Sequence, residues 1–84
     1  MKKIIMYSGP MCNFCEAAKR LLERNKLKYE VIDISTEESL RDEMIKKSNG
    51  KRTIPQIFFD DQHIGGYDEV RALEKENKLK DLLK

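Results

Sequence analysis

The chain has 84 residues, of which 39% are hydrophobic and 38% are charged, and its formal net charge is +2. This length accommodates one domain around one hydrophobic core, spanning residues 1–84, and the composition indicates a soluble globular protein rather than a membrane protein or a disordered tail. Because the net charge is small and both signs are interspersed, nucleic-acid binding is excluded as the main task.

The first apolar run, residues 4–7, is shorter than a signal-peptide core, and no later segment has the length of a membrane span. We therefore expect a cytoplasmic chain. In that compartment thiols are kept reduced, so two cysteines that are close in sequence are expected to be catalytic rather than a permanent cross-link.

A strand that runs into a helix is the first predicted unit. The strand covers residues 3–7 and ends at the breaker of residues 8–10. The helix covers residues 13–25. Its inward-facing side chains are Ala17, Ala18, Leu21 and Leu22. Cys12 and Cys15 lie where the two elements meet, in a Cys-x-x-Cys arrangement that is typical of redox motifs.

The position of this pair assigns a role to each cysteine. At a helix start, unpaired backbone N–H groups and the positive end of the helix dipole favour the thiolate of Cys12, which makes Cys12 the nucleophile. Cys15 lies one helical turn further along on the same face, so it can resolve a mixed disulfide formed on Cys12. Met11 and Phe14 fit an apolar rim of this site and core packing equally well.

Two other kinds of cysteine site compete with the redox interpretation. A structural zinc site needs four ligands, and beyond Cys12 and Cys15 the chain offers only His63, so no metal is expected. A structural disulfide or two core thiols also remain open, because free cysteine is often buried, although a helix start favours a reactive thiol. His63 itself is interpreted as a surface residue without a chemical role.

The middle of the chain predicts a second strand and a second helix. Residues 28–34 alternate polar and apolar side chains, and the strand they predict is parallel to the first because a helix connects the two. The helix that follows is capped by Ser35 or Thr36 and ends near residues 46–50, where cations and a glycine give a stop signal.

The last third of the chain predicts a hairpin and a third helix. Residues 56–59 and 62–65 form two antiparallel strands, with a proline at the entrance of the first. The third helix begins near Tyr67 or Asp68 after a glycine corner. Its apolar side chains are Val70 and Leu73, followed by Leu79, Leu82 and Leu83.

Three motifs taken together resemble the glutaredoxins, small members of the thioredoxin superfamily. They are Cys-x-x-Cys at residues 12–15, Thr-Ile-Pro-Gln-Ile-Phe at residues 53–58 and Gly-Gly-Tyr-Asp-Glu at residues 65–69. The match spans nearly the whole chain, and the combination is far more specific than Cys-x-x-Cys alone. The resemblance implies an α/β, thioredoxin-like fold with a mixed four-stranded sheet flanked by three helices, and glutathione as the thiol partner and co-substrate.

The resemblance also implies a glutathione site beside the cysteines. In the family the proline of the second motif is cis, so Pro55 should be cis, and the backbone of Ile54 then turns outward to pair with an extended peptide. Glutathione would lie along Thr53, Ile54 and Pro55 as a short added strand, with its sulfur directed at Cys12.

The third motif resembles the family's pocket for the γ-glutamyl end of glutathione, formed by Gly66, Tyr67 and Asp68. Backbone N–H groups at a helix start would hold its carboxylate, and the Asp68 side chain would pair with its ammonium. Without the other motifs, Gly65 and Gly66 would indicate a plain turn and Asp68 a helix cap.

One departure from the family pattern concerns a cation. Where relatives carry a lysine that binds the glycine carboxylate and helps to hold the thiolate, this chain has Gly9. Arg41, on the second predicted helix, is the candidate to take part of that role. Lys51 and Arg52 are nearer alternatives, and for Lys51 a solvated loop charge is the simpler interpretation.

The other departure is Asn13-Phe14 in place of the family's usual Pro-Tyr, which restores an N–H near the thiolate of Cys12. In the family, loss of that proline sometimes accompanies an iron–sulfur cluster held between two subunits, with glutathione supplying the remaining thiolates. An iron–sulfur carrier is therefore one alternative function.

The resemblance implies a glutathione-dependent thiol–disulfide oxidoreductase, a monomer that reduces glutathionylated and disulfide-bonded proteins through Cys12 and Cys15. No membrane or nucleic-acid partner is expected. The nearest alternative is a glutaredoxin-like electron donor reduced by thioredoxin reductase, which Gly9 favours. Such donors usually carry Trp-Ser-Gly-Phe-Arg-Pro where this chain has residues 65–69, and the chain has no tryptophan. A fold relic without activity is a third alternative.

Overall fold

The centre of the fold is a mixed four-stranded sheet with the strand order β2-β1-β3-β4. The structure, a computed structural model, describes all residues from 1 to 84. The strands are β1 (Ile4–Ser8), β2 (Glu30–Asp33), β3 (Gln56–Phe59) and β4 (Gln62–Gly65). β1 pairs in parallel with β2 and antiparallel with β3, and β3 forms an antiparallel hairpin with β4. The predicted parallel pair and the predicted hairpin are both confirmed.

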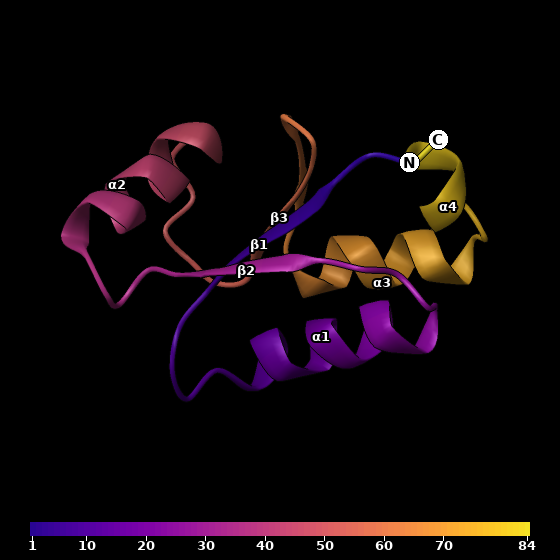
Figure 1. Cartoon of the computed structure of the whole chain (residues 1–84), viewed down its shortest axis with the longest axis horizontal. Coiled ribbons are helices and arrows are strands. Elements are labelled where there is room, and N and C mark those ends of the chain that lie inside the picture. The colour runs from indigo at the N-terminus through magenta and orange to yellow at the C-terminus, as the bar shows by residue number, and fades with distance from the viewer.

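Helices cover both faces of this sheet. α1 (Asn13–Arg24) and α3 (Tyr67–Lys75) lie together on one face, α2 (Glu38–Lys47) lies on the other, and α4 (Leu79–Leu82) lies at the C-terminal end (Figure 1). Because β1 leads directly into α1, the start of this helix lies at the edge of the sheet where β1 ends. That edge holds both cysteines.

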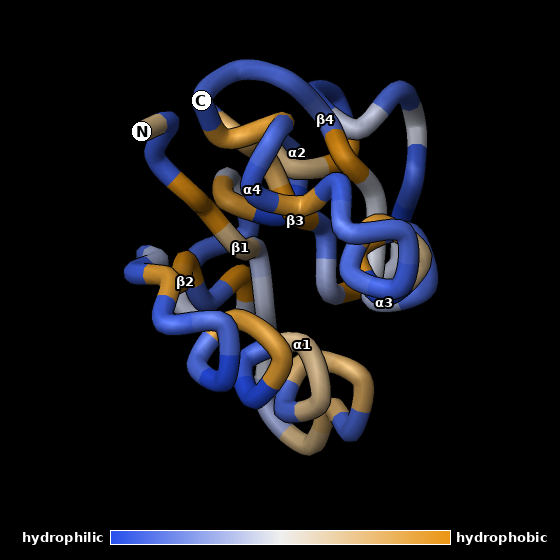
Figure 2. The backbone as a smooth tube through the Cα atoms, turned by 90° about the vertical axis from the view of Figure 1, so that its right-hand side faces the viewer, coloured by the Kyte–Doolittle hydropathy of each residue, from blue (hydrophilic) through white to orange (hydrophobic).

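The core is divided between the two faces because side chains alternate along a strand. From β1, Ile4 and Met6 enter the larger cluster, which α1 and α3 cover, whereas Tyr7 enters the smaller cluster, which α2 covers. β3 alternates in the same way, with Phe59 in the larger cluster and Phe58 in the smaller one. Figure 2 shows hydrophobic segments gathered in the strands, with hydrophilic segments in the surrounding turns. Burial on both faces explains the nearly continuous apolar sequence of β1 and β3.

Each of the three longer helices is followed, two residues after its last residue, by a residue with left-handed backbone conformation. These residues are Lys26 (φ 60°), Asn49 (φ 59°) and Asn77 (φ 58°). At the end of α3, the N–H groups of Asn77 and Lys78 donate back to carbonyl oxygens of the last turn, a pair of bonds that stops a helix. The third predicted helix is therefore divided, and its last apolar residues form the separate helix α4.

The predicted cap of α2 was wrong. The N-cap residue is Glu37, whose side chain makes no capping bond. The Ser35 N–H and hydroxyl donate to Asp33 Oδ1 at 2.8 and 2.6 Å, and the Thr36 hydroxyl donates to the Asp33 carbonyl oxygen at 2.9 Å. Both hydroxyls thus stabilise the turn after β2 and leave the helix start uncapped.

The two ends of the chain lie side by side (Figure 1). The Lys2 N–H donates to the carbonyl oxygen of Leu83 at 2.7 Å. Leu79 and Leu83 are buried in the larger cluster, which anchors the C-terminal segment. The first strand and the last helix therefore hold each other in place.

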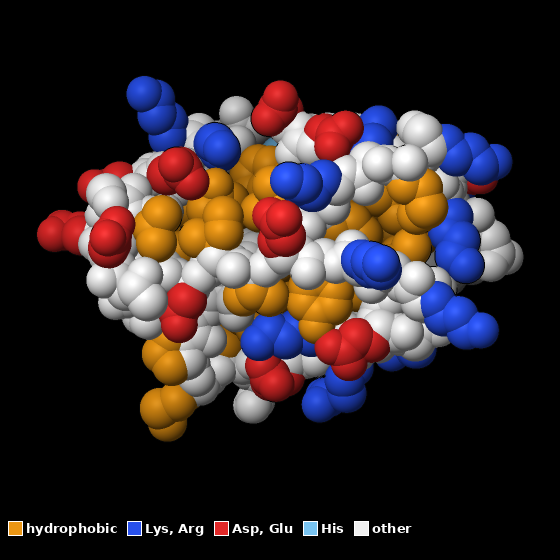
Figure 3. Space-filling view, in the orientation of Figure 1, with side chains coloured by type: hydrophobic (Ala, Val, Ile, Leu, Met, Phe, Trp, Pro, Cys, Tyr) orange, Lys and Arg blue, Asp and Glu red, His pale blue; other side chains and the backbone are white.

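The surface mixes both signs of charge. On the face drawn in Figure 3, Lys and Arg side chains are interspersed with Asp and Glu side chains around a strip of hydrophobic atoms. Val31 of β2, which is 43% exposed, is one of the few large hydrophobic side chains left open to solvent. No helix is both long enough and apolar enough to span a membrane.

Candidate functional site

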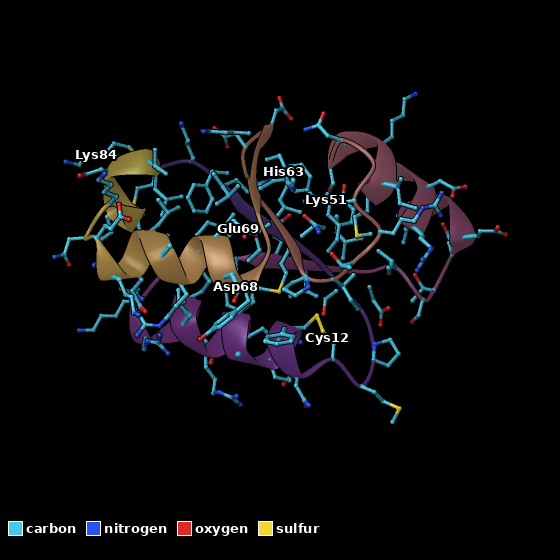
Figure 4. The ribbon with its side chains drawn as sticks, turned by 180° about the vertical axis from the view of Figure 1, so that it is seen from behind. Cys12, Lys51, His63, Asp68, Glu69 and Lys84 are labelled. Atoms are coloured by element: carbon cyan, nitrogen blue, oxygen red, sulfur yellow. A yellow bond between two sulfur atoms is a disulfide. The ribbon has the colours of Figure 1, made fainter.

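Cys12 is the N-cap residue of α1, and Cys15 lies in the first turn of the same helix. The two sulfur atoms form a disulfide, with the Cα atoms 5.2 Å apart, and Figure 4 shows it at the start of the helix. Sγ of Cys12 accepts the backbone N–H of Cys15 at 3.1 Å. In the reduced protein the same N–H would stabilise a thiolate on Cys12, in agreement with the expectation from the helix start.

A groove of about 290 Å³ extends from α1 along the loop before β3 to the start of α3. Its lining includes six of the seven residues predicted to bind glutathione: Thr53, Ile54 and Pro55 from the loop, and Gly66, Tyr67 and Asp68 from the start of α3. The peptide bond between Ile54 and Pro55 is cis, as predicted. Sγ of Cys12 lies 3.8 Å from the carbonyl oxygen of Ile54, so the reactive cysteine adjoins this groove.

The backbone of the loop at residues 52–55 is not paired with any other backbone segment. None of its residues makes a backbone–backbone hydrogen bond. The N–H and C=O of Ile54 are therefore available to a ligand. An extended peptide laid along the loop would pair with it as an added strand pairs with the edge of a sheet.

The start of α3 supplies backbone donors. The N–H groups of Tyr67 and Asp68 lie in the first turn and have no partner within the helix, and the helix dipole favours an anion there. The Gly66 N–H is already engaged, since it donates to the Glu69 carboxylate at 2.6 Å. Glu69 also packs over Gly65, where φ is +132° and a Cβ atom would lie 2.6 Å from Glu69 Oε1, so only glycine fits. The N–H groups of Tyr67 and Asp68 therefore remain for a ligand.

Among the candidate cations, Lys51 lines the groove, whereas Arg41 and Arg52 are exposed and do not. At Gly9, an added Cβ atom would lie 3.0 Å from Cδ1 of Ile54, so the Ile54 side chain occupies the space in which a longer residue would begin. Lys51 is thus the one Lys or Arg side chain in the groove lining. The structure does not bring Arg41 to the other predicted site residues.

His63, interpreted from the sequence as a surface residue, is partly buried and lines the groove. Its Nε2 lies 2.7 Å from Oε1 of Gln56, and its ring centroid lies 5.0 Å from that of Phe58. Burial lowers the pKa of His63 below its usual range, the Lys51 ammonium lowers it further, and Glu69 opposes both. The imidazole is therefore neutral at neutral pH. No local signal in the sequence indicates this position, because it depends on the pairing of His63 with Phe58 across the hairpin.

Phe14 and Met11 form an apolar rim around the cysteines rather than part of the core. Phe14 is 59% exposed and lines the groove, with its ring centroid 6.0 Å from that of Tyr67. Met11 is fully exposed just before Cys12. Apolar atoms at this entrance reduce the access of water to the reactive sulfur.

The comparison with protein families decides the identity of this fold and site. The family model described as Glutaredoxin matches residues 4–64. The chain belongs to the glutaredoxin family. Glutaredoxin 1 of Rickettsia prowazekii (strain Madrid E) is 46% identical over 82 residues, a match that covers 95% of this chain and 85% of the relative.

Solved structures of glutaredoxins confirm the predicted thioredoxin-like fold. The solution structure of a glutaredoxin from Brucella melitensis superimposes with a TM-score of 0.87 at 44% identity, covering 100% of this chain and 90% of that one. The crystal structure of a buckwheat glutaredoxin–glutathione complex also gives a TM-score of 0.87, at 26% identity, covering 98% of this chain and 76% of that one.

Membership of the glutaredoxin family makes this chain a thiol–disulfide redox protein, with Cys12 and Cys15 as its redox pair. The structure contains no group of three or more His, Cys, Asp or Glu side chains placed to hold a metal ion. The chemistry that this redox pair offers is disulfide exchange, and Cys12 lies beside the groove.

Proposed function

We propose that this glutaredoxin-family chain is a glutathione-dependent thiol–disulfide oxidoreductase that acts on glutathionylated and disulfide-bonded proteins. The observation that supports this most is the groove beside Cys12, which combines an unpaired loop backbone with the free N–H groups at the start of α3. Glutathione is an extended tripeptide with a carboxylate at each end, so its chemistry matches both features. The buckwheat relative has been solved in complex with glutathione, which supports the same ligand here.

Each part of the glutathione moiety has a partner in this proposal. Its cysteinyl backbone pairs with the N–H and C=O of Ile54, which directs its sulfur toward Cys12. Its γ-glutamyl carboxylate accepts from the N–H groups of Tyr67 and Asp68, and its ammonium pairs with the Asp68 carboxylate. Its glycine carboxylate pairs with the Lys51 ammonium.

Glutathionylated proteins are reduced in two exchanges that need only Cys12. The Cys12 thiolate attacks the glutathione sulfur, so that a Cys12–glutathione disulfide forms, the protein–glutathione disulfide breaks, and the protein leaves as a thiolate that takes a proton from water. A second glutathione thiolate then attacks the glutathione sulfur held on Cys12 and releases the Cys12 thiolate. The net reaction converts a protein–glutathione disulfide and a glutathione thiol into a protein thiol and glutathione disulfide.

Protein disulfides are reduced with both cysteines. Cys12 attacks one sulfur and forms a mixed disulfide, while the other substrate cysteine leaves as a thiolate. Cys15 then attacks Sγ of Cys12, which forms the Cys12–Cys15 disulfide and releases the second substrate thiol. This oxidised state is the one in the structure. Two glutathione molecules return it to the dithiol and leave as glutathione disulfide.

The test is turnover of the mixed disulfide between glutathione and 2-mercaptoethanol, with NADPH oxidation followed in the presence of glutathione and glutathione reductase. We expect turnover that depends on the chain. A parallel assay replaces glutathione and its reductase by thioredoxin reductase, and no turnover is expected there. Turnover with thioredoxin reductase alone would favour the electron-donor alternative, and turnover in neither assay would contradict both functions.

A further inference from the structure

The loop at residues 52–55 is tied to the sheet by one buried side chain. Gln56 Nε2 donates to the Thr53 carbonyl oxygen at 3.0 Å and to Thr53 Oγ1 at 3.2 Å. Gln56 is 2% exposed and is the first residue of β3, where it pairs with Tyr7 of β1, so its own backbone is fixed by the sheet. Because the loop has no backbone–backbone bonds, this side chain is its main polar anchor.

His63 sets the orientation of the Gln56 amide. A backbone carbonyl oxygen can only accept, so the amide nitrogen of Gln56 must face Thr53 and its Oε1 must face His63. His63 Nε2 lies 2.7 Å from that oxygen and must therefore carry a hydrogen and donate it. The contact selects the Nε2–H tautomer of the neutral imidazole.

We propose that this relay, from His63 through Gln56 to Thr53, positions the Ile54 backbone for the glutathione moiety. The proposal rests on the proposed function and adds positioning residues that act through the loop. Without a donor at position 63, Gln56 Oε1 would lack its partner in a buried site, and the amide would rotate to recover one and release Thr53. The loosened loop would bind glutathione mixed disulfides more weakly and leave the chemistry at Cys12 unchanged.

Two substitutions separate the hydrogen-bond donor of His63 from its ring. His63→Phe keeps a ring against Phe58 and donates nothing, whereas His63→Gln retains an amide donor. We expect His63→Phe to raise KM for the glutathione mixed disulfide about fivefold with kcat within about twofold of the wild type, and His63→Gln to recover most of the loss. Gln62→Ala, an exposed change in the same hairpin, should alter neither constant. An unchanged KM in His63→Phe, or an equal rise in both His63 variants, would overturn the relay.

Nuclear magnetic resonance of the folded protein tests the relay without turnover. The ¹⁵N shifts of the His63 ring should place the proton on Nε2, and the Gln56 side-chain amide protons should exchange with solvent slowly, about tenfold or more slower than in His63→Phe. A ring proton on Nδ1 at neutral pH, or unprotected Gln56 amide protons in the wild type, contradicts the relay whatever the activity. If both signatures are present and turnover is absent, only the proposed function fails.

Discussion

Cys15 has no exposed surface, whereas Cys12 is partly exposed at the N-cap of α1. An incoming disulfide can therefore reach Sγ of Cys12 but not that of Cys15. The Cys15 N–H, 3.1 Å from Sγ of Cys12, adds to the difference because it stabilises negative charge on Cys12 alone. Exposure and hydrogen bonding together support the proposed roles, attack by Cys12 and resolution by Cys15.

Replacing each cysteine by serine separates the two proposed reactions. Cys12→Ser should abolish turnover of glutathione mixed disulfides and of protein disulfides, because both begin with the Cys12 thiolate. Cys15→Ser should retain turnover of mixed disulfides and lose about tenfold or more of its activity on protein disulfides. Both variants are measured in the glutathione reductase assay with each substrate class. An equal loss in the two variants would reverse the assignment of roles.

Lys51 and Arg41 are distinguished by their positions relative to the groove. Lys51→Gln should raise KM for the glutathione mixed disulfide about three- to tenfold at low ionic strength, because it removes the only Lys or Arg of the lining. Added salt should reduce the difference in KM between Lys51→Gln and the wild type, since salt screens the attraction between the Lys51 ammonium and the glycine carboxylate of glutathione. Arg41→Gln, an exposed position on α2, is the matched comparison and should change KM by less than about twofold. A larger rise in KM for Arg41→Gln than for Lys51→Gln would restore Arg41 as the cation that binds the glycine carboxylate.

Two of the segments that line the groove could be predicted from the sequence, because Thr53-Ile54-Pro55 and Gly66-Tyr67-Asp68 are contiguous motifs. The contact between His63 and Gln56 could not. It depends on the register of the β3–β4 hairpin, which shifts between Ile57 and Phe58. A shift of one residue changes which side chains meet, and no local sequence pattern reports it.

At the scale of elements, Glu74 joins α3 to α1. Its carboxylate accepts from Arg24 Nε and Nη2 at 2.9 and 2.6 Å and from Asn25 Nδ2 at 2.6 Å. The Glu74 side chain is 16% exposed, so these bonds are partly shielded from water. The bonds from Arg24 above all, and then the bond from Asn25, lower the pKa of Glu74 to about 2 against the opposing effect of burial.

Glu74→Gln should lower the free energy of unfolding by about 1 kcal/mol at neutral pH, a value that allows for solvent screening of the partly exposed ion pair. The pKa of Glu74 is about 2 in the folded chain and 4.5 when unperturbed. Its contribution is therefore present above about pH 4.5 and is lost as the pH falls toward about 2.

Urea denaturation of wild type and Glu74→Gln across this pH range measures the effect. The difference in the free energy of unfolding between wild type and Glu74→Gln should be constant above about pH 5 and shrink progressively below that pH. Glu76→Gln, in an exposed pair with Lys78, is the control and should change stability little at any pH. A Glu74→Gln difference that does not shrink toward pH 2 would show that the ionised carboxylate is not its source.

Most strands and helices could be predicted from the sequence, but the exact ends of two helices could not. The apolar residues after Lys75 continue the helical pattern and hide the break at Asn77, where asparagine tolerates the left-handed conformation. Ser35 and Thr36 have the chemistry of caps, but Asp33 lies close enough to engage both hydroxyls first. Local backbone conformation decided the end of α3, and local competition for hydrogen bonds decided the start of α2.

At the scale of the whole molecule, two hydrophobic clusters share one sheet, because β1 and β3 contribute alternate side chains to both. α2 is joined to the smaller cluster by Met44, which is fully buried. A polar contact supports it, since the Tyr7 hydroxyl donates to the Glu43 carboxylate at 2.6 Å. Burial, reinforced by Glu43, raises the pKa of Tyr7 above its usual range. The shared strands should make the two faces unfold together.

Met44→Ala should lower the free energy of unfolding by about 3 kcal/mol, a large share of the stability of a domain of this size. We expect a single transition, with the loss of helix by circular dichroism and the change in tyrosine fluorescence at the same urea concentration. Met11→Ala is the control, since Met11 is fully exposed. Two separate transitions in Met44→Ala would mean that α2 and its cluster unfold independently of the rest.

The parallel pair of β1 and β2 and the hairpin of β3 and β4 could be predicted because each of these two connections leaves few choices. The strand order could not, because α2 joins β2 to β3 and these strands lie on opposite sides of β1 and run in opposite directions. The rules for short connections act on the sequence directly, whereas burial of single polar residues such as Gln56 depends on the finished packing. The fold was therefore more predictable than the contacts that hold the groove in shape.

The hydrogen bond between Lys2 and Leu83 places the first and last residues at the end of the molecule away from the disulfide (Figures 1 and 4). The longest dimension of the molecule is 35 Å, so a fluorescent reporter attached at either terminus would leave the reactive sulfur open to its substrates. A linker of a few residues would also join the termini, so circular permutants with new ends in exposed turns are accessible. The same adjacency suits this fold for insertion, as an intact redox module, into a surface loop of a host protein.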